Sequence, residues 1–302
     1  MKIFFLFAVV GGILFFLLGA VIFRDSTTKA QILTPLAQSI FRIPEAPASQ
    51  KTLFQIIEEV LGESKETYGV VIKNLKTGES YSLNEQKKFE SASLYKLWVM
   101  AVVFEQIQTG KLKEEEVLRR DVQSLNEVFH IASESAELTE GIVAFSVKDA
   151  VEKMITISHN YAALLLSEKV RIANVKTFLK ANGFTSSSFG EPPVTTPQDI
   201  ASFFEKLYKD QLINSHYSER MMELLKNQKL DNKLPKYLPE NIVVAHKTGE
   251  LGSFTHDAGI VFGTKSDYIL VILSESNSPQ GAEERIALLS KAVYEYFEGI
   301  PK

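Results

Sequence analysis

After residue 50, the apolar positions follow first a helical period and then a strand period. In TLFQIIEEVLG the apolar residues share one helical stripe and Gly62 follows as a stop signal, which predicts a helix over residues 53–61. From Tyr68 to Leu83 apolar residues alternate on both sides of a polar turn, which predicts a β-hairpin.

A run with almost no polar face starts at Ser93. The segment LYKLWVMAVVFEQIQTG is apolar on nearly every side until its last turn, which is typical of a helix through the middle of a domain. Gly110 is placed to cap that helix in the left-handed conformation. We expect Ser93 in the first helical turn, where the helix dipole stabilises negative charge. Lys96, one turn later, would share its face.

The middle of the chain is predicted to be mainly helical, whereas its end returns to strands. Three β-type runs are followed by a long amphipathic helix. We therefore expect an α+β fold (an α/β sandwich), in which an antiparallel sheet from the N- and C-terminal parts is flanked by helices. An all-helical lobe would be inserted at about residues 86–235. The segments are KLKEEEVL, SVKDAVEKMITI, QDIASFFEKLYKD and SERMMELLKNQ for helices, NIVVAHKTG, HDAGIVFGT and SDYILVILSES for strands, and AEERIALLSKAVYEYFEG for the last helix.

Residues 3–23 are apolar and contain no charged side chain. At about 1.5 Å per residue, a helix of this length can cross a hydrocarbon core of about 30 Å. A signal peptide normally has a shorter apolar region. We predict a transmembrane anchor at residues 1–23, with a cleaved signal segment as the alternative, then a linker at 24–50 and a folded domain at 51–300.

Composition and charge exclude several classes of function. With 302 residues, 45% hydrophobic and 23% charged, the chain has the composition of a globular protein. A net charge of −4 gives no reason to expect a nucleic-acid partner. The chain has no Cys, which excludes disulfides and thiolate chemistry. His246 and His256 lack a third ligand at suitable spacing, so we expect neither a metal nor a cofactor.

Three short motifs carry the candidate chemistry. A serine with a lysine one helical turn away has the geometry of a nucleophile whose proton is taken by an amine. The second motif follows the first serine by 65 residues, and the third follows the second by 89. In chain order they are Ser93-x-x-Lys96, Ser158-x-Asn160 and Lys247-Thr248-Gly249.

Each motif alone is weak. A serine at a helix start is usually only a cap, and Ser-x-Asn recurs at Ser82 and Ser124. Lys-Thr-Gly recurs at Lys76, but that copy lies at a predicted turn tip, whereas Lys247 follows a predicted strand. We therefore interpret the Lys76 copy as a surface turn.

The three motifs in this order resemble those of the active-site-serine penicillin-recognising enzymes, and their flanks resemble class A β-lactamases. The resemblance covers about residues 50–298 and implies a β-lactamase/transpeptidase-like fold. It also implies a serine hydrolase that opens β-lactam rings through an acyl-enzyme. A D-alanyl-D-alanine carboxypeptidase acting on peptidoglycan, a penicillin-binding sensor acylated without turnover, and a scaffold without activity remain alternatives. The segments that carry the likeness are FESASLYKLWVM, MITISHNYAALLL, TTPQDIA, HKTGELG and HDAGIV.

The resemblance implies a role for each motif residue. Ser93 would attack the carbonyl, Lys96 would act as the base, and Ser158 would relay a proton to the departing nitrogen. Burial and the neighbouring ammonium of Lys247 would lower the pKa of Lys96 from its usual value of about 10.4.

The substrate would be a β-lactam or a peptidoglycan stem peptide. Asn160 would hold its side-chain amide, and Lys247 and Thr248 would bind its carboxylate. Gly249 completes that motif, and the backbone amide of Glu250, together with that of Ser93, would form the oxyanion hole. Such substrates place the catalytic domain outside the bacterial cytoplasmic membrane, anchored by the N-terminal helix, or secreted if that segment is cleaved.

Two positions depart from the class A pattern. His159 stands where an Asp is usual in the second motif. Glu191-Pro192 resembles the site of the carboxylate that activates hydrolytic water in class A enzymes. Glu191, however, lies only four residues before Thr195, in a loop shorter than the family's. Glu191 is thus a candidate deacylation base, with a surface carboxylate as the alternative; without a base the acyl-enzyme would persist.

Overall fold

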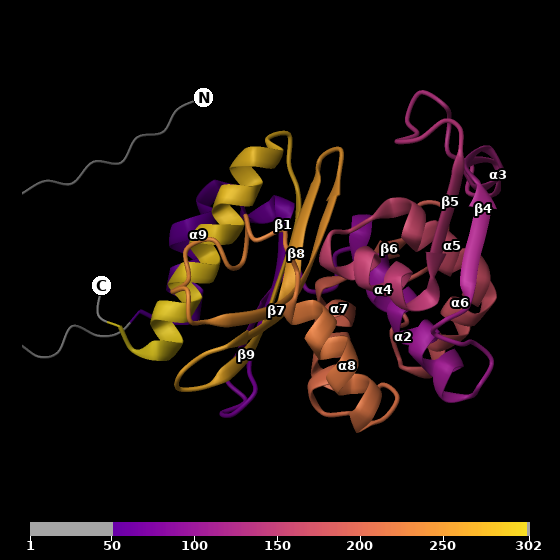
Figure 1. Cartoon of the computed structure of the whole chain (residues 1–302). Helices are drawn as coiled ribbons and strands as arrows, with labels where there is room; N and C mark the ends of the chain where they lie inside the picture. Colours follow the sequence, from indigo (N-terminus) through magenta and orange to yellow (C-terminus); the bar gives the residue numbers. More distant parts are fainter. Residues whose placement is uncertain (1–50, 301–302) are drawn as a thin grey trace, which may run out of the picture. The chain divides into compact units, whose positions relative to one another are not determined.

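Five strands from the two ends of the chain form one antiparallel sheet (Figure 1). The structure is a computed structural model and describes residues 51–300. The spatial order is β2-β1-β9-β8-β7, so strands from before and after the helical middle are neighbours. The predicted sheet built from both ends of the chain is therefore confirmed. The strands are β1 (Tyr68–Asn74), β2 (Ser80–Leu83), β7 (Val243–Leu251), β8 (Phe254–Phe262) and β9 (Asp267–Glu275).

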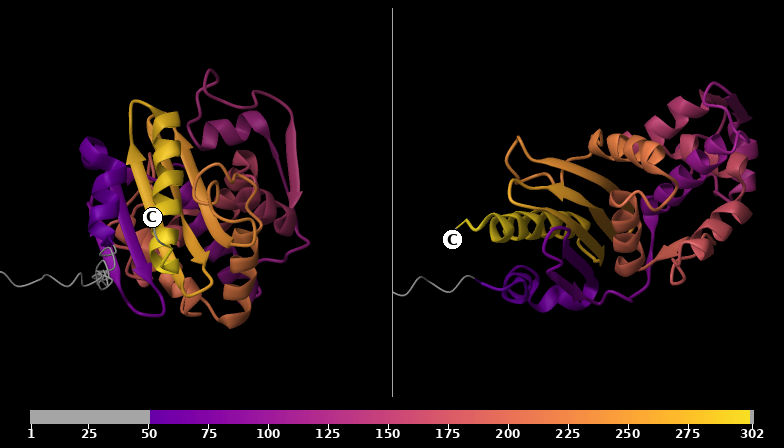
Figure 2. Two further views of the ribbon diagram at one scale, coloured as in Figure 1. Left: turned by 90° about the vertical axis from the view of Figure 1, so that its left-hand side faces the viewer. Right: turned by 90° about the horizontal axis from the view of Figure 1, so that it is seen from below.

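The sheet is covered on both faces, as Figure 2 shows for α9 on one side and the helices of the middle of the chain on the other. Along β9, successive side chains enter two different cores because strand residues alternate between faces. Leu270 packs in the core with α1 (Leu53–Leu61) and α9 (Pro279–Glu298), and Val271 packs in the core of the helical side. This explains why the run from residue 268 to residue 273 is apolar throughout.

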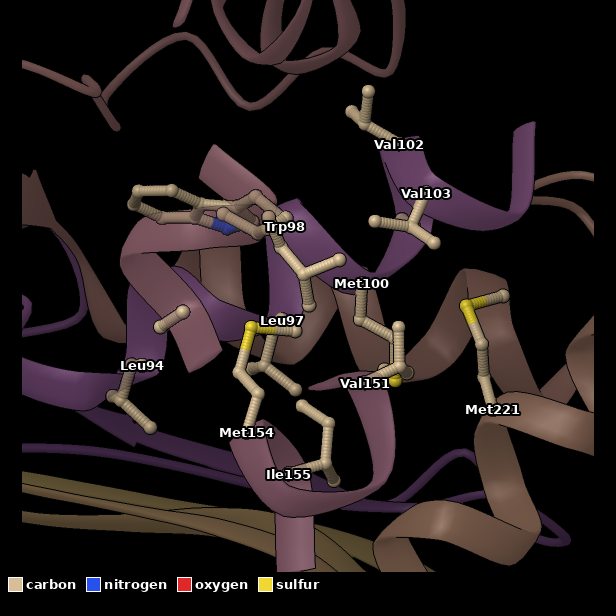
Figure 3. Packing of buried hydrophobic residues seen from close by; sticks show 14 of the residues in the cluster. Leu94, Leu97, Trp98, Met100, Val102, Val103, Val151, Met154, Ile155 and Met221 are labelled. Atoms are coloured by element: carbon tan, nitrogen blue, oxygen red, sulfur yellow. The ribbon is translucent and has the colours of Figure 1, made fainter. Parts of the chain in front are cut away.

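Helix α2 (Lys96–Gln108) crosses the centre of the helical side. Every residue from Lys96 to Phe104 is buried, which confirms the prediction of a central helix. In Figure 3 its side chains pack with those of α4 and α8, including Met154 and Met221. The other helices are α3 (Val122–Val128), α4 (Val147–Thr156), α5 (Asn160–Val170), α6 (Ile172–Ala181), α7 (Pro197–Tyr208) and α8 (Ser215–Lys226), with short 3-10 turns η1 (Gly62–Thr67) and η2 (Ala92–Tyr95).

The segment KLKEEEVL is not a helix, and the inserted lobe is not all-helical because it contains short strands, so both predictions are wrong. It leads into strand β4 (Val117–Asp121), which pairs with β5 (Ile142–Ser146) about twenty residues later. Non-local strand pairing of this kind overrides local helix propensity. A second short pair joins β3 (Phe89–Glu90) to β6 (Val194–Thr195) and ties the segment before Ser93 to the loop after α6.

The predicted anchor at residues 1–23 and the linker at 24–50 lie outside the described residues. Within residues 51–300, no helix combines the length and the apolar character needed to cross a membrane. The division of the chain into anchor, linker and catalytic domain stays a prediction.

Candidate active site

Ser93 lies in the one-turn 3-10 helix η2, directly before α2. The sequence predicted Ser93 inside the first turn of the α-helix, but α2 begins at Lys96. The reason is local: Ala92 has a positive φ of 43°, and the Leu94 amide bonds the Ser91 carbonyl at 2.9 Å, which tightens the turn. Ser93 is half-buried, and among the described residues its hydroxyl makes no hydrogen bond.

The Lys96 amine is buried at the centre of a polar cluster. Its Nζ donates to the Ser158 carbonyl at 2.6 Å, to Ser158 Oγ at 3.1 Å and to Asn160 Oδ1 at 2.6 Å. Burial lowers the pKa of Lys96 to about 7, against the opposing field of the Glu137 carboxylate. Near neutral pH, Lys96 can therefore both accept and release a proton, as a catalytic base must.

Ser158 stands in the connection between α4 and α5, at a positive φ of 56°. This left-handed conformation is uncommon for residues other than Gly. It persists only where the surrounding structure holds the backbone in place. His159 is the N-cap of α5, and its Nδ1 accepts from the Ala162 amide at 3.3 Å. The His at the unusual motif position therefore shapes the turn that presents Ser158 to Lys96.

A second lysine reaches the same hydroxyl from the sheet. Lys247 Nζ, on β7, donates to Ser158 Oγ at 3.0 Å and to the Thr248 carbonyl at 2.9 Å. Burial lowers the pKa of Lys247 well below its usual value, and the nearby ammonium of Lys96 is the second cause that lowers it. When both amines donate, both lone pairs of Ser158 Oγ are occupied, so its own hydrogen points away from the two lysines.

Gly249 lets β7 approach the turn that carries Ser93. A Cβ at this position would lie 3.2 Å from the Ser91 carbonyl oxygen and 3.4 Å from Ala92 Cβ, tighter than ordinary packing. Because Gly249 has no side chain, β7 can lie close to η2. The backbone amide of Glu250 follows directly after Gly249 on this strand. The Glu250 side chain instead turns to Lys233, whose own side chain is fully buried.

Glu191 is not brought to this cluster. Its side chain is 69% exposed, and its Oε1 lies 3.9 Å from Nε2 of His130. Both residues line a mainly apolar cavity of about 630 Å³ that also contacts Tyr95. The short loop is fixed in this path by the Ser91 amide, which bonds the Pro193 carbonyl at 2.8 Å.

Sequence reasoning missed two charged residues at the site. Glu137 accepts a hydrogen bond from Asn160 Nδ2, and Lys233 pairs with Glu250. Glu137 lies in the polar segment ASESAELTEG, which has no periodicity, and Lys233 lies in an irregular segment before β7. No local sequence signal marks either residue.

The two strand histidines have structural partners. His246 Nδ1 contacts Asp257 Oδ1 at 2.9 Å; burial opposes its protonation, but Asp257 and Asp231 prevail and raise the pKa of His246. His256 Nε2 donates to the Glu90 carbonyl at 2.8 Å, and burial lowers the pKa of His256 to about 4. Within residues 51–300 no group of three or more His, Cys, Asp or Glu side chains is arranged to hold a metal ion.

Comparisons of the sequence and of the structure with known proteins find relatives with related names. A model of the "Beta-lactamase enzyme family" matches residues 52–297. Beta-lactamase VEB-1 of Pseudomonas aeruginosa is 24% identical over 293 residues, covering 88% of this chain and 97% of the relative. The structure of PBP-A superimposes with a TM-score of 0.72 at 23% identity, covering 82% of this chain and 96% of PBP-A. A mutant of PBP-A, in an acyl-enzyme complex with penicillin G, superimposes with a TM-score of 0.70 at 21% identity, covering 83% and 99%. These likenesses confirm the predicted fold.

Proposed function

Because the chain belongs to the Beta-lactamase enzyme family, we propose that it is a serine acyl hydrolase that opens β-lactam rings through an acyl-enzyme on Ser93. One observation carries the proposal most directly: the amines of Lys96 and Lys247 converge on Ser158 Oγ, at 3.1 and 3.0 Å. This arrangement connects a base three residues after the nucleophile to a hydroxyl that can donate a proton.

In the acylation step, Ser93 Oγ bonds to the lactam carbonyl carbon and the carbon–nitrogen bond of the ring breaks. Lys96 takes the proton of Ser93, and Ser158 delivers a proton to the departing nitrogen. Ser158 recovers its proton from the Lys96 ammonium, to which it is already hydrogen-bonded. The step therefore leaves both residues in their starting protonation states.

The remaining motif residues bind the substrate and stabilise charge. The backbone amides of Ser93 and Glu250 form the oxyanion hole, where fixed donors meet the charge that develops on the carbonyl oxygen. Lys247, Thr248 and the Gly249 backbone bind the substrate carboxylate, and Asn160 binds its side-chain amide.

A D-alanyl-D-alanine carboxypeptidase acting on peptidoglycan stem peptides is the second candidate. The exposure of Glu191 favours it, because this carboxylate is 69% exposed and contacts His130, whereas a deacylation base has to hold a water molecule against the acylated serine. A peptidase that forms a long-lived penicilloyl adduct uses the same acylation machinery. The likeness to the penicillin G acyl-enzyme of a PBP-A mutant is compatible with both candidates. In either case we propose a catalytic domain outside the cytoplasmic membrane.

The lifetime of the adduct separates the two functions. The full chain is mixed with benzylpenicillin, and its intact mass is followed from milliseconds to hours while penicilloic acid is quantified. An adduct that forms and decays as product accumulates identifies a β-lactamase. An adduct that persists identifies a peptidase or a sensor, and release of D-Ala from an acyl-D-Ala-D-Ala peptide then distinguishes these. Absence of both the adduct and penicilloic acid overturns the proposal.

A further inference from the structure

Glu137 reaches the substrate-binding side of the site from a loop that is far away in sequence. Asn160 Nδ2 donates a hydrogen bond to Glu137 Oε1, while Asn160 Oδ1 accepts from Lys96 at 2.6 Å. The amide of Asn160 thus connects an exposed carboxylate to the buried base. Glu137 itself is exposed, so its carboxylate can still meet a ligand.

The backbone that carries Glu137 is fixed by buried polar side chains. The Tyr161 hydroxyl donates to the Leu138 carbonyl at 2.7 Å and accepts from the Leu138 amide at 3.1 Å. Asn126 Nδ2 donates to the same carbonyl at 2.9 Å, and its Oδ1 lies 3.0 Å from the Tyr161 hydroxyl. Tyr161 is 2% exposed and Asn126 8%. This clamp holds the backbone N–H and C=O of Leu138, the residue next to Glu137.

The second N–H of Asn160 determines where a substrate would lie. One amide hydrogen binds Glu137, and the other is available for the side-chain carbonyl of the substrate. Because the two N–H bonds diverge by about 120°, an acceptor on the second lies about 5 Å from the Glu137 oxygen, with hydrogen bonds of about 2.9 Å. A group on the carbon next to that carbonyl can therefore touch Glu137.

We propose that Glu137 is a specificity-determining residue that selects substrates with a cationic group, such as an ammonium, on the carbon next to the side-chain carbonyl. This inference rests on the proposed function, because it requires the substrate amide to bind Asn160. An ammonium is attracted by the carboxylate, whereas an anionic group at the same carbon is repelled. Tyr161 and Asn126 are positioning residues for this selection, acting through the backbone of Leu138.

Three penicillins that differ mainly at this carbon test the inference. Benzylpenicillin carries hydrogen there, ampicillin an ammonium and carbenicillin a carboxylate. Second-order acylation constants are measured at pH 6, where an α-amine with a pKa of about 7.7 to 8.0 is protonated. The ratio of two constants in one variant cancels the protonation of Lys96, which all three substrates use.

In Glu137→Gln, the ampicillin-to-benzylpenicillin ratio should fall about threefold to fivefold, near the upper range of an exposed ion pair. The carbenicillin-to-benzylpenicillin ratio should rise by a similar factor, and both changes should shrink at high salt. Tyr161→Phe, which frees the loop, should change both ratios in the same directions. Glu140→Gln is the matched control, because it removes an exposed carboxylate from the same loop and should leave both ratios unchanged.

Equal ratios in the intact protein and in Glu137→Gln overturn this inference and leave the proposed function standing. If the ratios are equal and the adducts of Glu137→Gln also persist longer, the inference is overturned in the same way, because Glu137 would then act in hydrolysis rather than in substrate recognition. If benzylpenicillin gives neither an adduct nor penicilloic acid with the intact protein, the proposed function fails first and the inference fails with it.

Discussion

Ser158 is the residue on which the site depends, because it joins two lysines from different parts of the fold. Lys96 comes from the start of α2 and Lys247 from β7, and both have lowered pKa values because they are buried. Burial disfavours the charged form of both amines, which lowers the cost of bringing them to one hydroxyl. Proton transfer through Ser158 should therefore depend on pH in the physiological range.

Acylation by benzylpenicillin should become faster as the pH rises through about 7. The pKa of Lys96 is lowered to about 7, and only its neutral amine can take the proton of Ser93. The acylation constant should therefore be small at pH 5.5 and reach a plateau above pH 8. Lys96→Arg should lower it by at least about 100-fold, because a guanidinium cannot act as a base at these pH values. Stopped-flow measurements from pH 5.5 to 9 provide the profile.

The control for this experiment is Lys76→Arg, which changes the lysine of the surface Lys-Thr-Gly copy. Its profile should match that of the unmodified protein. A flat profile in the unmodified protein, or a Lys96→Arg variant that still acylates at the normal rate, would exclude Lys96 as the base.

The three motifs could be recognised because each consists of residues at a fixed short spacing along the chain. Ser93 and Lys96 are one helical turn apart, and Lys247 follows a recognisable strand. The contact of Glu137 with Asn160 could not be predicted, because it depends on the path of a loop held by Tyr161 and Asn126.

At the scale of elements, the loop after α6 and the strand β8 determine how the site is closed and supported. The loop is short and is pinned to the segment before Ser93 through β3 and β6. Strand β8 lies between β7 and β9 and carries His256.

The long strands and helices follow from apolar periodicity in the sequence. The pairing of β4 with β5 does not, because its partner strand is distant and each of the two strands buries only one residue, Leu118 and Val143.

Glu191→Gln should not change the rate at which a penicilloyl adduct is hydrolysed. The Glu191 side chain is 69% exposed and faces His130 rather than the cluster at Ser158. Decay of the adduct, followed by intact mass after excess benzylpenicillin is removed, provides the measurement, with Glu140→Gln as a charge-matched control. A decay at least about tenfold slower in Glu191→Gln alone would identify Glu191 as the base after all.

His256 should make the folded protein less stable in acid. Its Nε2 donates to the Glu90 carbonyl and its Nδ1 accepts from the Ser274 amide at 3.2 Å, a pattern that only the neutral ring satisfies. Its folded pKa of about 4 lies below the usual histidine value of 6.5, so the unfolded chain binds the proton first. The free energy of unfolding should therefore fall by about 3 kcal/mol as the pH decreases from 6.5 to 4.

Urea unfolding at pH 7 and pH 4.5 tests this expectation. His256→Gln should lose part of the difference between the two pH values, whereas His130→Gln, at an exposed position, should retain it. An equal pH dependence in both variants would show that acid destabilisation arises elsewhere.

At the scale of the whole molecule, the sheet separates a supporting core from the core that carries the site. The order of predicted elements indicated a sheet made from both ends, because strands before and after the helical middle need partners. The sequence could not specify which side chains enter which core, since both faces of β9 are apolar. The register of β1, β8 and β9 determines that assignment.

Leu270→Ala should destabilise the protein without changing its chemistry. Leu270 is fully buried in the core with α1 and α9, on the face of the sheet opposite to the helical side. Its truncation should lower the free energy of unfolding by about 2 to 5 kcal/mol and leave the acylation constant within about twofold. Chemical denaturation and stopped-flow acylation, measured on the same preparation, test both parts. A much slower acylation would show that the two cores are coupled.

The position of the covalent bond tests the central claim most directly. The full chain is treated with benzylpenicillin, quenched in acid and digested, and the modified peptide is sequenced by mass spectrometry, with Ser93→Ala and Ser124→Ala in parallel. We predict one penicilloyl group on Ser93, unchanged in Ser124→Ala and absent in Ser93→Ala. A penicilloyl group on another residue, or one that survives in Ser93→Ala, would contradict the assignment of Ser93 as the nucleophile.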